Sequence, residues 1–233
     1  MEVTGGMLKA VIFDFDGVIA DSELLHYRAM NEAMRRRGAD IPKALHWEKY
    51  LGFTDYENAR VVNKDFQMEW GEDILLEIVE EKTAIFDRLV KEETTIIDGV
   101  EEFVRRVMDG GIPMAVCSGA TQKDIRQMLN GSTLDGKFQF MVTADDVKQG
   151  KPDPEGYLLA LARLNNGTLG AIMPAQCVVV EDSRWGLEAA AAAGMHRVGV
   201  TNTYPAEHLR QYAEMVVERL DAIQISDLQV LCR

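Results

Sequence analysis

The sequence predicts an α/β fold, in which a doubly wound parallel sheet of the Rossmann type carries an inserted all-helical domain. Short apolar runs rich in β-branched residues alternate with segments of helical period over most of the chain. That alternation is typical of a parallel sheet with helices on both faces. The stretch from about Ser22 to Thr95 breaks the pattern, because it has strong helical periodicity and no convincing strand. We therefore expect a helical insertion directly after the first strand.

The strands are expected in short apolar runs. These runs are Ala10 to Phe13, Met114 to Cys117, Phe138 to Val142 and Cys177 to Val180. Helices are expected from Val100 to Met108, after Thr121, after Pro154, and from Trp185 to Ala193. The helix that begins at Val100 is the clearest, because its apolar residues recur on one face and two glycines follow it as a stop signal.

The insertion is expected to contain two amphipathic helices. One runs from Glu23 to Arg37 and ends at Gly38, and the other has an apolar side from Ile74 to Val90. The core domain then comprises residues 1–21 and 96–233, and the helical cap domain comprises residues 22–95. Insertions at this edge of a sheet tend to cover the site.

The composition is that of an ordinary soluble protein and disfavours two classes of partner. The 233 residues are 47% hydrophobic and 27% charged, which allows a sizeable core. The formal net charge of -13 would repel nucleic acid and anionic membranes. Cys117, Cys177 and Cys232 are widely separated and odd in number, and no secretory segment or membrane span is recognised. We therefore expect reduced, buried thiols in a cytoplasmic protein.

Two carboxylates come directly after the first apolar run, in the segment Asp14-Phe15-Asp16-Gly17. Open α/β sheets bind ligands at the carboxyl ends of their strands. A turn at Gly17 would let Asp16 reach the other side of a ligand, so that one carboxylate attacks while the other handles a proton. Alone, this pair is a weak signal, because acidic pairs in turns are common and usually solvated.

Three further stretches place polar groups where the same site would need them. Each also has a plainer interpretation as a turn, a helix cap or a solvated lysine. Since parallel strands bring their carboxyl ends to one edge, the joint occurrence of all the stretches in this order favours convergence. Asp14 and Asp182 would then offer hard oxygens to Mg²⁺, and Lys151 would neutralise an anionic ligand. The stretches are Ser118-Gly119, Gly150-Lys151-Pro152 and Glu181-Asp182-Ser183.

These motifs resemble the four ordered motifs of the haloacid dehalogenase superfamily, and the resemblance spans nearly the whole chain. They are Asp-Phe-Asp-Gly-Val, Ser-Gly after a strand, Gly-Lys-Pro, and Val-Val-Val-Glu-Asp-Ser. The helical insertion is similar to the cap of the group that includes β-phosphoglucomutase, phosphoglycolate phosphatase and sugar-phosphate phosphatases. Haloacid dehalogenases themselves lack the second aspartate of the first motif, which is Asp16 here, so dehalogenation is not expected.

The resemblance implies Mg²⁺-dependent phosphoryl transfer. Asp14 would attack phosphorus to form an aspartyl-phosphate, and Asp16 would protonate the leaving oxygen and later deprotonate water. The implied ligands of Mg²⁺ are Asp14, the backbone carbonyl of Asp16 and Asp182. Glu181 would contact these ligands or bind the metal through a water molecule. The implied phosphate-binding residues are Ser118, Gly119 and Lys151.

We expect a phosphatase that acts on a small phosphorylated metabolite, such as a sugar or polyol phosphate. A phosphomutase is the first alternative, and it would need a cap cation for a second phosphate. Where β-phosphoglucomutases have a lysine before a cap glycine and an arginine three positions after it, this chain has Leu51, Gly52 and Asp55. Arg60 and Lys64 could substitute from the next helix turn. A non-catalytic module similar to receiver domains is the second alternative, although it would not need the large cap.

Residues of the insertion are weaker candidates. Asp21, Ser22 and His26 match the hinge segment of β-phosphoglucomutase-like members, and His26 could bind substrate or lie on a helix surface. An aromatic group around Gly52 is expected to pack in the core of the insertion rather than to face a sugar. Its members are Trp47, Tyr50, Phe53 and Tyr56. The motifs leave both the leaving group and the oligomeric state open.

Overall fold

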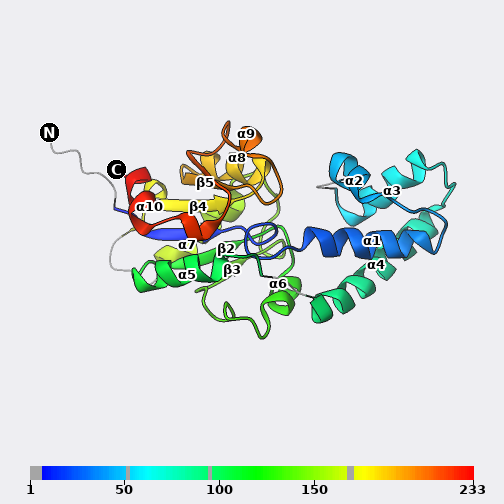
Figure 1. Cartoon of the computed structure of the whole chain (residues 1–233), viewed down its shortest axis with the longest axis horizontal. Coiled ribbons are helices and arrows are strands. Elements are labelled where there is room, and N and C mark those ends of the chain that lie inside the picture. Colours follow the sequence, from blue (N-terminus) through cyan, green and yellow to red (C-terminus); the bar gives the residue numbers. More distant parts are fainter. Residues whose placement is uncertain (1–6, 51–52, 94–95, 167–170) are drawn as a thin grey trace. The chain divides into compact units, whose positions relative to one another are not determined.

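The computed structural model describes residues 7–50, 53–93, 96–166 and 171–233. The chain forms two compact units (Figure 1). We call Met1–Asp21 together with Thr95–Arg233 the core unit, and Ser22–Thr94 the helical unit.

The core unit is built on a six-stranded parallel sheet with the strand order β3-β2-β1-β4-β5-β6. β1 is central and fully buried, and its last residue, Phe13, pairs with Val116 of β2 and Val180 of β4. The carboxyl ends of the three central strands therefore lie side by side, and the predicted fold class is confirmed. The strands are β1 (Ala10–Phe13), β2 (Met114–Cys117), β3 (Met141–Val142), β4 (Cys177–Glu181), β5 (His196–Val200) and β6 (Met215–Val217).

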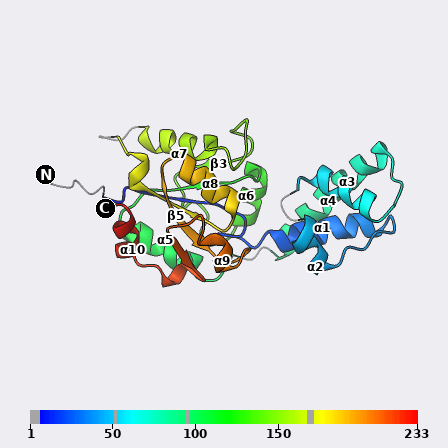
Figure 2. The same ribbon diagram turned by 90° about the horizontal axis from the view of Figure 1, so that it is seen from above.

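Helices cover both faces of this sheet (Figure 2). On one face Ala10 and Ile12 share a buried cluster with residues of α7 and α8. On the other face Phe13 meets Phe103 of α5 edge to face, with ring centroids 5.8 Å apart. Alternate residues of β1 thus serve opposite layers. The helices are α5 (Val100–Asp109), α6 (Gln122–Leu129), α7 (Glu155–Asn165), α8 (Arg184–Ala192), α9 (Ala206–Leu209) and α10 (Ile225–Leu231), with short 3₁₀ turns η2 (Pro174–Gln176) and η3 (Leu220–Ala222).

The sheet differs from the sequence prediction in two places. The run from Phe138 to Val142 was expected to be a strand, but β3 contains only its last two residues. Phe138 instead packs edge to face against Phe13, with centroids 5.7 Å apart, so its apolar character reflects core packing. β5 and β6 extend the sheet beyond the four predicted runs. Their residues are less completely buried than those of β1, because they lie toward the sheet edge.

In the described residues of the helical unit, all regular secondary structure is helical, and turns and loops join the helices. α1 and α4 pack on each other, with His26 of α1 stacked on Phe86 of α4, and Arg37 forms ion pairs with Glu77 and Glu81 of α4. α1 ends two residues earlier than predicted, and a hydrogen-bonded turn leads to Gly38, which has a φ of 91°. The elements are α1 (Glu23–Arg35), α2 (Lys43–Leu45), the π-helical turn η1 (His46–Tyr50), α3 (Asp55–Asp65) and α4 (Glu72–Glu93).

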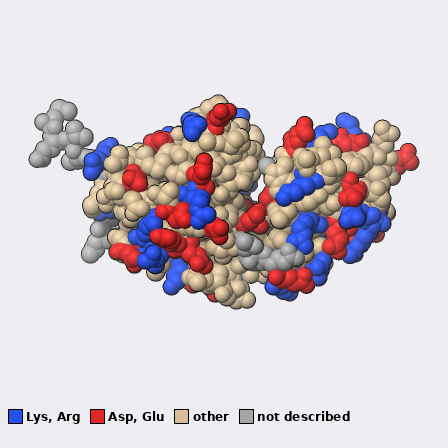
Figure 3. Space-filling model, viewed as in Figure 1, with Lys and Arg blue, Asp and Glu red and all other residues tan. Residues whose placement is uncertain are grey.

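Charged side chains of both signs are mixed over the visible face of each unit (Figure 3). Within the described residues, no helix is both long enough and apolar enough to cross a membrane.

Candidate active site

The chain turns sharply where β1 ends. Asp14 is 6% exposed, and its backbone N–H donates to the carbonyl of Val180 in β4 at 2.9 Å. Gly17 has a φ of 74°, a conformation that favours glycine. A Cβ at this position would lie 1.9 Å from Oδ2 of Asp182, so a side chain would not fit. The turn therefore brings the backbone of the first motif into contact with the carboxylate that follows β4.

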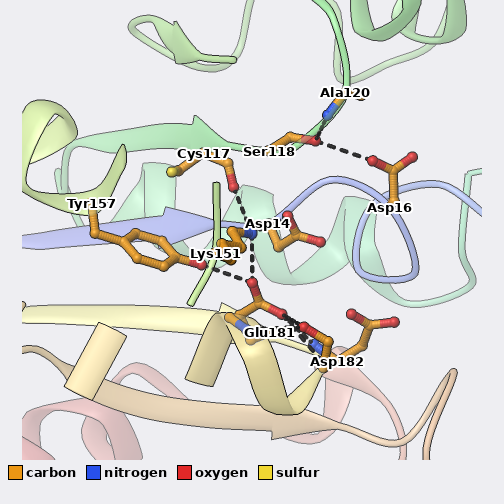
Figure 4. Close-up of polar contacts among 11 residues, drawn as sticks. Asp14, Asp16, Cys117, Ser118, Ala120, Lys151, Tyr157, Glu181 and Asp182 are labelled. Carbon is orange, nitrogen blue, oxygen red and sulfur yellow. Dashed lines mark hydrogen bonds and ion pairs between the residues drawn. The ribbon is translucent and has the colours of Figure 1, made fainter. Parts of the chain in front are cut away.

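Lys151 connects three segments of the core unit (Figure 4). Its ammonium group donates to Oδ1 of Asp14 at 2.5 Å, to Oε1 of Glu181 at 2.6 Å and to the carbonyl of Cys117 at 3.1 Å. Lys151 thus lies between the ends of β1, β2 and β4. A partly buried ammonium group with these partners is well placed to balance anionic charge.

Glu181 is fully buried, and both of its carboxylate oxygens accept hydrogen bonds. Oε1 accepts from Lys151 and from the hydroxyl of Tyr157 at 2.8 Å. Oε2 accepts from the hydroxyl of Ser183 at 2.9 Å and from two backbone N–H groups. The carboxylate fits here because Gly186 has no side chain: a Cβ there would lie 1.6 Å from Oε1. These protein contacts compete with direct metal ligation by Glu181.

Ser118 connects the end of β2 to the second aspartate of the first motif. Its hydroxyl donates to Oδ2 of Asp16 at 3.1 Å and accepts from the N–H of Ala120 at 2.9 Å. At Gly119, a Cβ would meet no atom within 4 Å, so this backbone borders open space. The first two motifs therefore meet through a direct hydrogen bond.

The carboxylates shift one another's protonation. Burial raises the pKa of Asp14 well above its ordinary value, Lys151 opposes this, and neighbouring carboxylates reinforce it. Burial and Glu181 raise the pKa of Asp182 to about 8. Burial would lower the pKa of Lys151, but Asp14 and Glu181 raise it well above its ordinary value. Lys151 alone therefore does not offset the negative charge that these carboxylates would carry if all of them were ionised.

The same residues fit a divalent cation. Asp14, Glu181 and Asp182 are buried, and each offers a carboxylate oxygen within 4.8 Å of the others. Hard oxygen donors and unbalanced negative charge are what a divalent cation such as Mg²⁺ requires. Because both oxygens of Glu181 accept hydrogen bonds from the protein, Asp14 and Asp182 are the better candidates for direct ligands.

The family model for haloacid dehalogenase-like hydrolases matches residues 11–200. This chain belongs to that family. A phosphorylated carbohydrates phosphatase of Thermotoga maritima is 34% identical over 192 residues, which cover 82% of this chain and 84% of the relative. Fructose-1-phosphate phosphatase YqaB of Escherichia coli is 31% identical, with 82% of this chain and 95% of the relative covered. Among solved structures, a β-phosphoglucomutase of Clostridium difficile has a TM-score of 0.78 and 27% identity, with 97% of each chain covered.

Three contacts of this haloacid dehalogenase-like site involve residues that the sequence analysis did not single out. Tyr157 donates to Glu181, Thr203 donates to Oδ2 of Asp182, and Asn202 donates to the carbonyl of Gly17. The other site residues are predicted by their position next to short apolar runs. Asn202 and Thr203 follow β5 in this way, but that strand was not among the predicted runs.

The weaker candidates belong to the helical unit or its junction. His26 stacks on Phe86 of α4 with ring centroids 4.1 Å apart, and its Nδ1 accepts from Lys82 at 2.9 Å. Lys82 is 4% exposed and also donates to Asp55 at 2.7 Å. His26 is therefore packed between helices rather than free on a helix surface. Asp21 is exposed and Ser22 is buried.

The aromatic group of the insertion is not uniformly buried. Tyr50 is 1% exposed and donates to Asp65 at 2.8 Å, as expected for core packing. The prediction is wrong for Phe53, which is 43% exposed. Trp47 and Tyr56 are partly buried, and Leu51 and Gly52 lie outside the described residues.

Proposed function

We propose that this chain is a Mg²⁺-dependent phosphatase that hydrolyses a small sugar or polyol phosphate through a phosphorylated aspartate. The observation that carries the proposal is the contact of Lys151 with both Asp14 and Glu181, next to Asp182. Membership of a hydrolase family supports phosphoric monoester hydrolysis. The substrate class is supported by relatives named as phosphatases of phosphorylated carbohydrates and of fructose 1-phosphate.

In the proposed reaction, a carboxylate oxygen of Asp14 attacks phosphorus in line with the leaving oxygen. The bond from phosphorus to the leaving group breaks as the bond to Asp14 forms, and Asp16 gives its proton to the leaving oxygen. Water then attacks the aspartyl-phosphate and gives a proton to Asp16. Phosphate departs and the carboxylate of Asp14 is restored.

Lys151 and Ser118 have complementary roles in this proposal. Lys151 offsets the charge of the phosphoryl group, and its two carboxylate partners hold the ammonium group in place. The Ser118 hydroxyl donates to Asp16 in the structure, and in the proposal it would turn its single proton to a phosphoryl oxygen when substrate binds, beside the open backbone at Gly119.

The metal would be held by Asp14, by Asp182 and by the backbone carbonyl of Asp16. When bound, a divalent cation offsets the repulsion between an anionic nucleophile and an anionic substrate. Without it, burial and neighbouring carboxylates raise the pKa of Asp14 and so disfavour the ionised nucleophile. Lys151 acts in the opposite sense and favours the ionised carboxylate.

A phosphomutase is the second candidate, favoured by the likeness to the β-phosphoglucomutase structure. Against it, Asp55 occupies the position of the mutase's cap arginine, and its carboxylate pairs with Lys82. We expect no conversion of β-glucose 1-phosphate to glucose 6-phosphate when the bisphosphate activator is supplied. Efficient isomerisation with little phosphate release would contradict the phosphatase proposal and support the phosphomutase.

The cytoplasm is the proposed compartment, and small metabolites are the proposed partners. Cys117, Cys177 and Cys232 are buried as free thiols, which suits a reducing compartment. The net charge of -13 disfavours nucleic acid as a partner.

The direct test is a phosphate-release screen over phosphorylated metabolites, with and without Mg²⁺. We expect release from at least one sugar or polyol phosphate, loss of activity in EDTA, and recovery when excess Mg²⁺ is added. Asp14→Asn protein serves as the control for contaminating phosphatases. Turnover that persists after exhaustive chelation would contradict the metal requirement, and no release from any ester would contradict the phosphatase assignment.

A further inference from the structure

The loop that follows β5 contributes two side chains to the edge of the site. We propose that Thr203 and Asn202 are positioning residues, which hold the Asp182 carboxylate and the Gly17 turn in the arrangement that binds the divalent cation. This inference rests on the metal requirement of the proposed function. Neither residue is proposed to touch the reacting atoms.

Thr203 restricts the carboxylate of Asp182. Its hydroxyl donates to Oδ2 of Asp182, and the same oxygen lies against the backbone of Gly17. A Cβ on Gly17 would be 1.9 Å from this oxygen and 2.8 Å from Oγ1 of Thr203, so the three groups are in close contact. Rotation of the carboxylate would break the hydrogen bond or press an oxygen into the Gly17 turn. The hydroxyl and the turn together therefore select one orientation of Asp182.

Asn202 stabilises the Gly17 turn, which forms the other half of the contact with Asp182. Its side-chain amide donates to the carbonyl of Gly17 at 2.8 Å, while the N–H of Gly17 donates to the carbonyl of Ala20 at 2.9 Å. Both polar groups of the Gly17 backbone are thus bonded. Gly17 immediately follows Asp16, whose backbone carbonyl is a proposed ligand, so Asn202 stabilises the turn that presents this carbonyl.

The loop is itself anchored in the sheet. The N–H of Thr201 donates to the carbonyl of Val217 at 3.0 Å, at the end of β6. Pro205 then precedes α9, and its carbonyl accepts from the N–H of His208 at 3.0 Å. Asn202 and Thr203 therefore lie in a short segment with backbone hydrogen bonds on both sides, and these bonds fix the positions of the two side chains at the site.

Hydrogen bonds from outside the ligand set orient metal-binding side chains, and their loss typically costs about 10- to 100-fold in metal affinity or activity. Valine has nearly the shape of threonine but no hydroxyl, and serine retains the hydroxyl. Thr203→Val and Thr203→Ser therefore separate the hydrogen bond from packing. Thr201→Val, two positions earlier in the same loop, is the matched control.

The test measures Mg²⁺ binding to the whole 233-residue chain by isothermal titration calorimetry without substrate. We expect Thr203→Val to raise the Kd for Mg²⁺ about 10- to 100-fold. Thr203→Ser and Thr201→Val should stay within about threefold of wild type. Unfolding temperatures in EDTA verify that each variant is folded. A wild-type Kd in Thr203→Val, or an equally weak Kd in Thr203→Ser, would overturn the role of the hydroxyl.

Asn202→Ala tests the second anchor through a different measurement. We expect a lower kcat at saturating Mg²⁺ with little change in KM, because the displaced turn carries Asp16 as well as the proposed ligand carbonyl. An unchanged kcat would remove Asn202 from the proposal. Failure of the wild-type chain to bind Mg²⁺ would overturn the proposed metal requirement together with this inference, whereas equal binding by wild type and Thr203→Val would overturn the inference alone.

Discussion

The ammonium nitrogen of Lys151 lies 2.5 Å from Oδ1 of Asp14, although 137 positions separate the two residues in the chain. This contact places a cation against the proposed nucleophile. Burial and the neighbouring carboxylates raise the pKa of Asp14, and Lys151 opposes them by favouring the ionised carboxylate, which is the form that attacks phosphorus. Lys151 therefore balances part of the site's negative charge and also favours the reactive form of Asp14.

Asp14→Asn should abolish turnover and leave the fold intact. The amide is nearly isosteric with the carboxylate and can still accept a hydrogen bond from Lys151, but it is a poor nucleophile and a poor ligand for Mg²⁺. Phosphate release and the unfolding temperature are the two measurements. Asp109→Asn, on an exposed position at the end of α5, is the control and should be fully active. Retained turnover in Asp14→Asn would rule out the aspartyl-phosphate route.

Lys151→Ala should lower kcat by at least about a hundredfold, because charge stabilisation in the transition state is lost. Lys148→Ala removes the same charge three positions earlier, from an exposed side chain, and should keep kcat near the wild-type value. Steady-state kinetics at saturating substrate and Mg²⁺ compare the variants. Equal kcat values for Lys151→Ala and Lys148→Ala would contradict a specific role of Lys151 in transition-state stabilisation.

Asp55→Ala should destabilise the helical unit by about 2 kcal/mol, because it leaves the buried Lys82 ammonium group without its carboxylate partner. The expected loss is smaller than for a fully buried pair, since 37% of the Asp55 side chain is exposed. Asp98→Ala is the control, because Asp98 is 90% exposed and lies 3.6 Å from Arg219. Its effect should stay below about 0.5 kcal/mol. Denaturant unfolding gives both values, and equal losses would mean that the Asp55–Lys82 pair is no more important than a surface pair.

His26 should make stability depend on pH. Burial and the Lys82 ammonium group lower the pKa of His26 well below 6.5, and Lys82 can only donate to Nδ1 when that nitrogen is unprotonated. Above pH 6.5 the ring is neutral in the folded and unfolded chains. Below it, the unfolded chain takes up a proton that the folded chain does not, so stability falls by up to about 1.4 kcal/mol per pH unit.

Unfolding free energies at pH 8 and pH 5.5 test this prediction in wild type and in His26→Gln. The variant should lose less stability than wild type between these two values, because glutamine does not titrate. An identical loss in both proteins would show that other groups cause the pH dependence.

Much of the core could be predicted from local sequence. Ala10 to Phe13 is a short, wholly apolar run that predicts a buried strand, and Asp14 and Asp16 after it indicated a site only together with the later motifs. The helix from Val100 also begins where predicted and ends one residue later than predicted, because its apolar face and following glycines are local signals. β5 and β6 were not predicted, since their apolar runs are short and their residues are partly exposed.

Residue types and their order along the chain were enough to identify Asp14, Asp16, Ser118, Lys151, Glu181 and Asp182 as candidates, because each follows a local pattern. The partners of these residues depended on folding. Asn202 bonds to Gly17 across 185 positions, and Thr203 bonds to Asp182 across 21. Hydrogen bonds act over about 3 Å, so their partners are determined by how β1, β4 and β5 align in the sheet, and that alignment comes from the packing of the whole core unit.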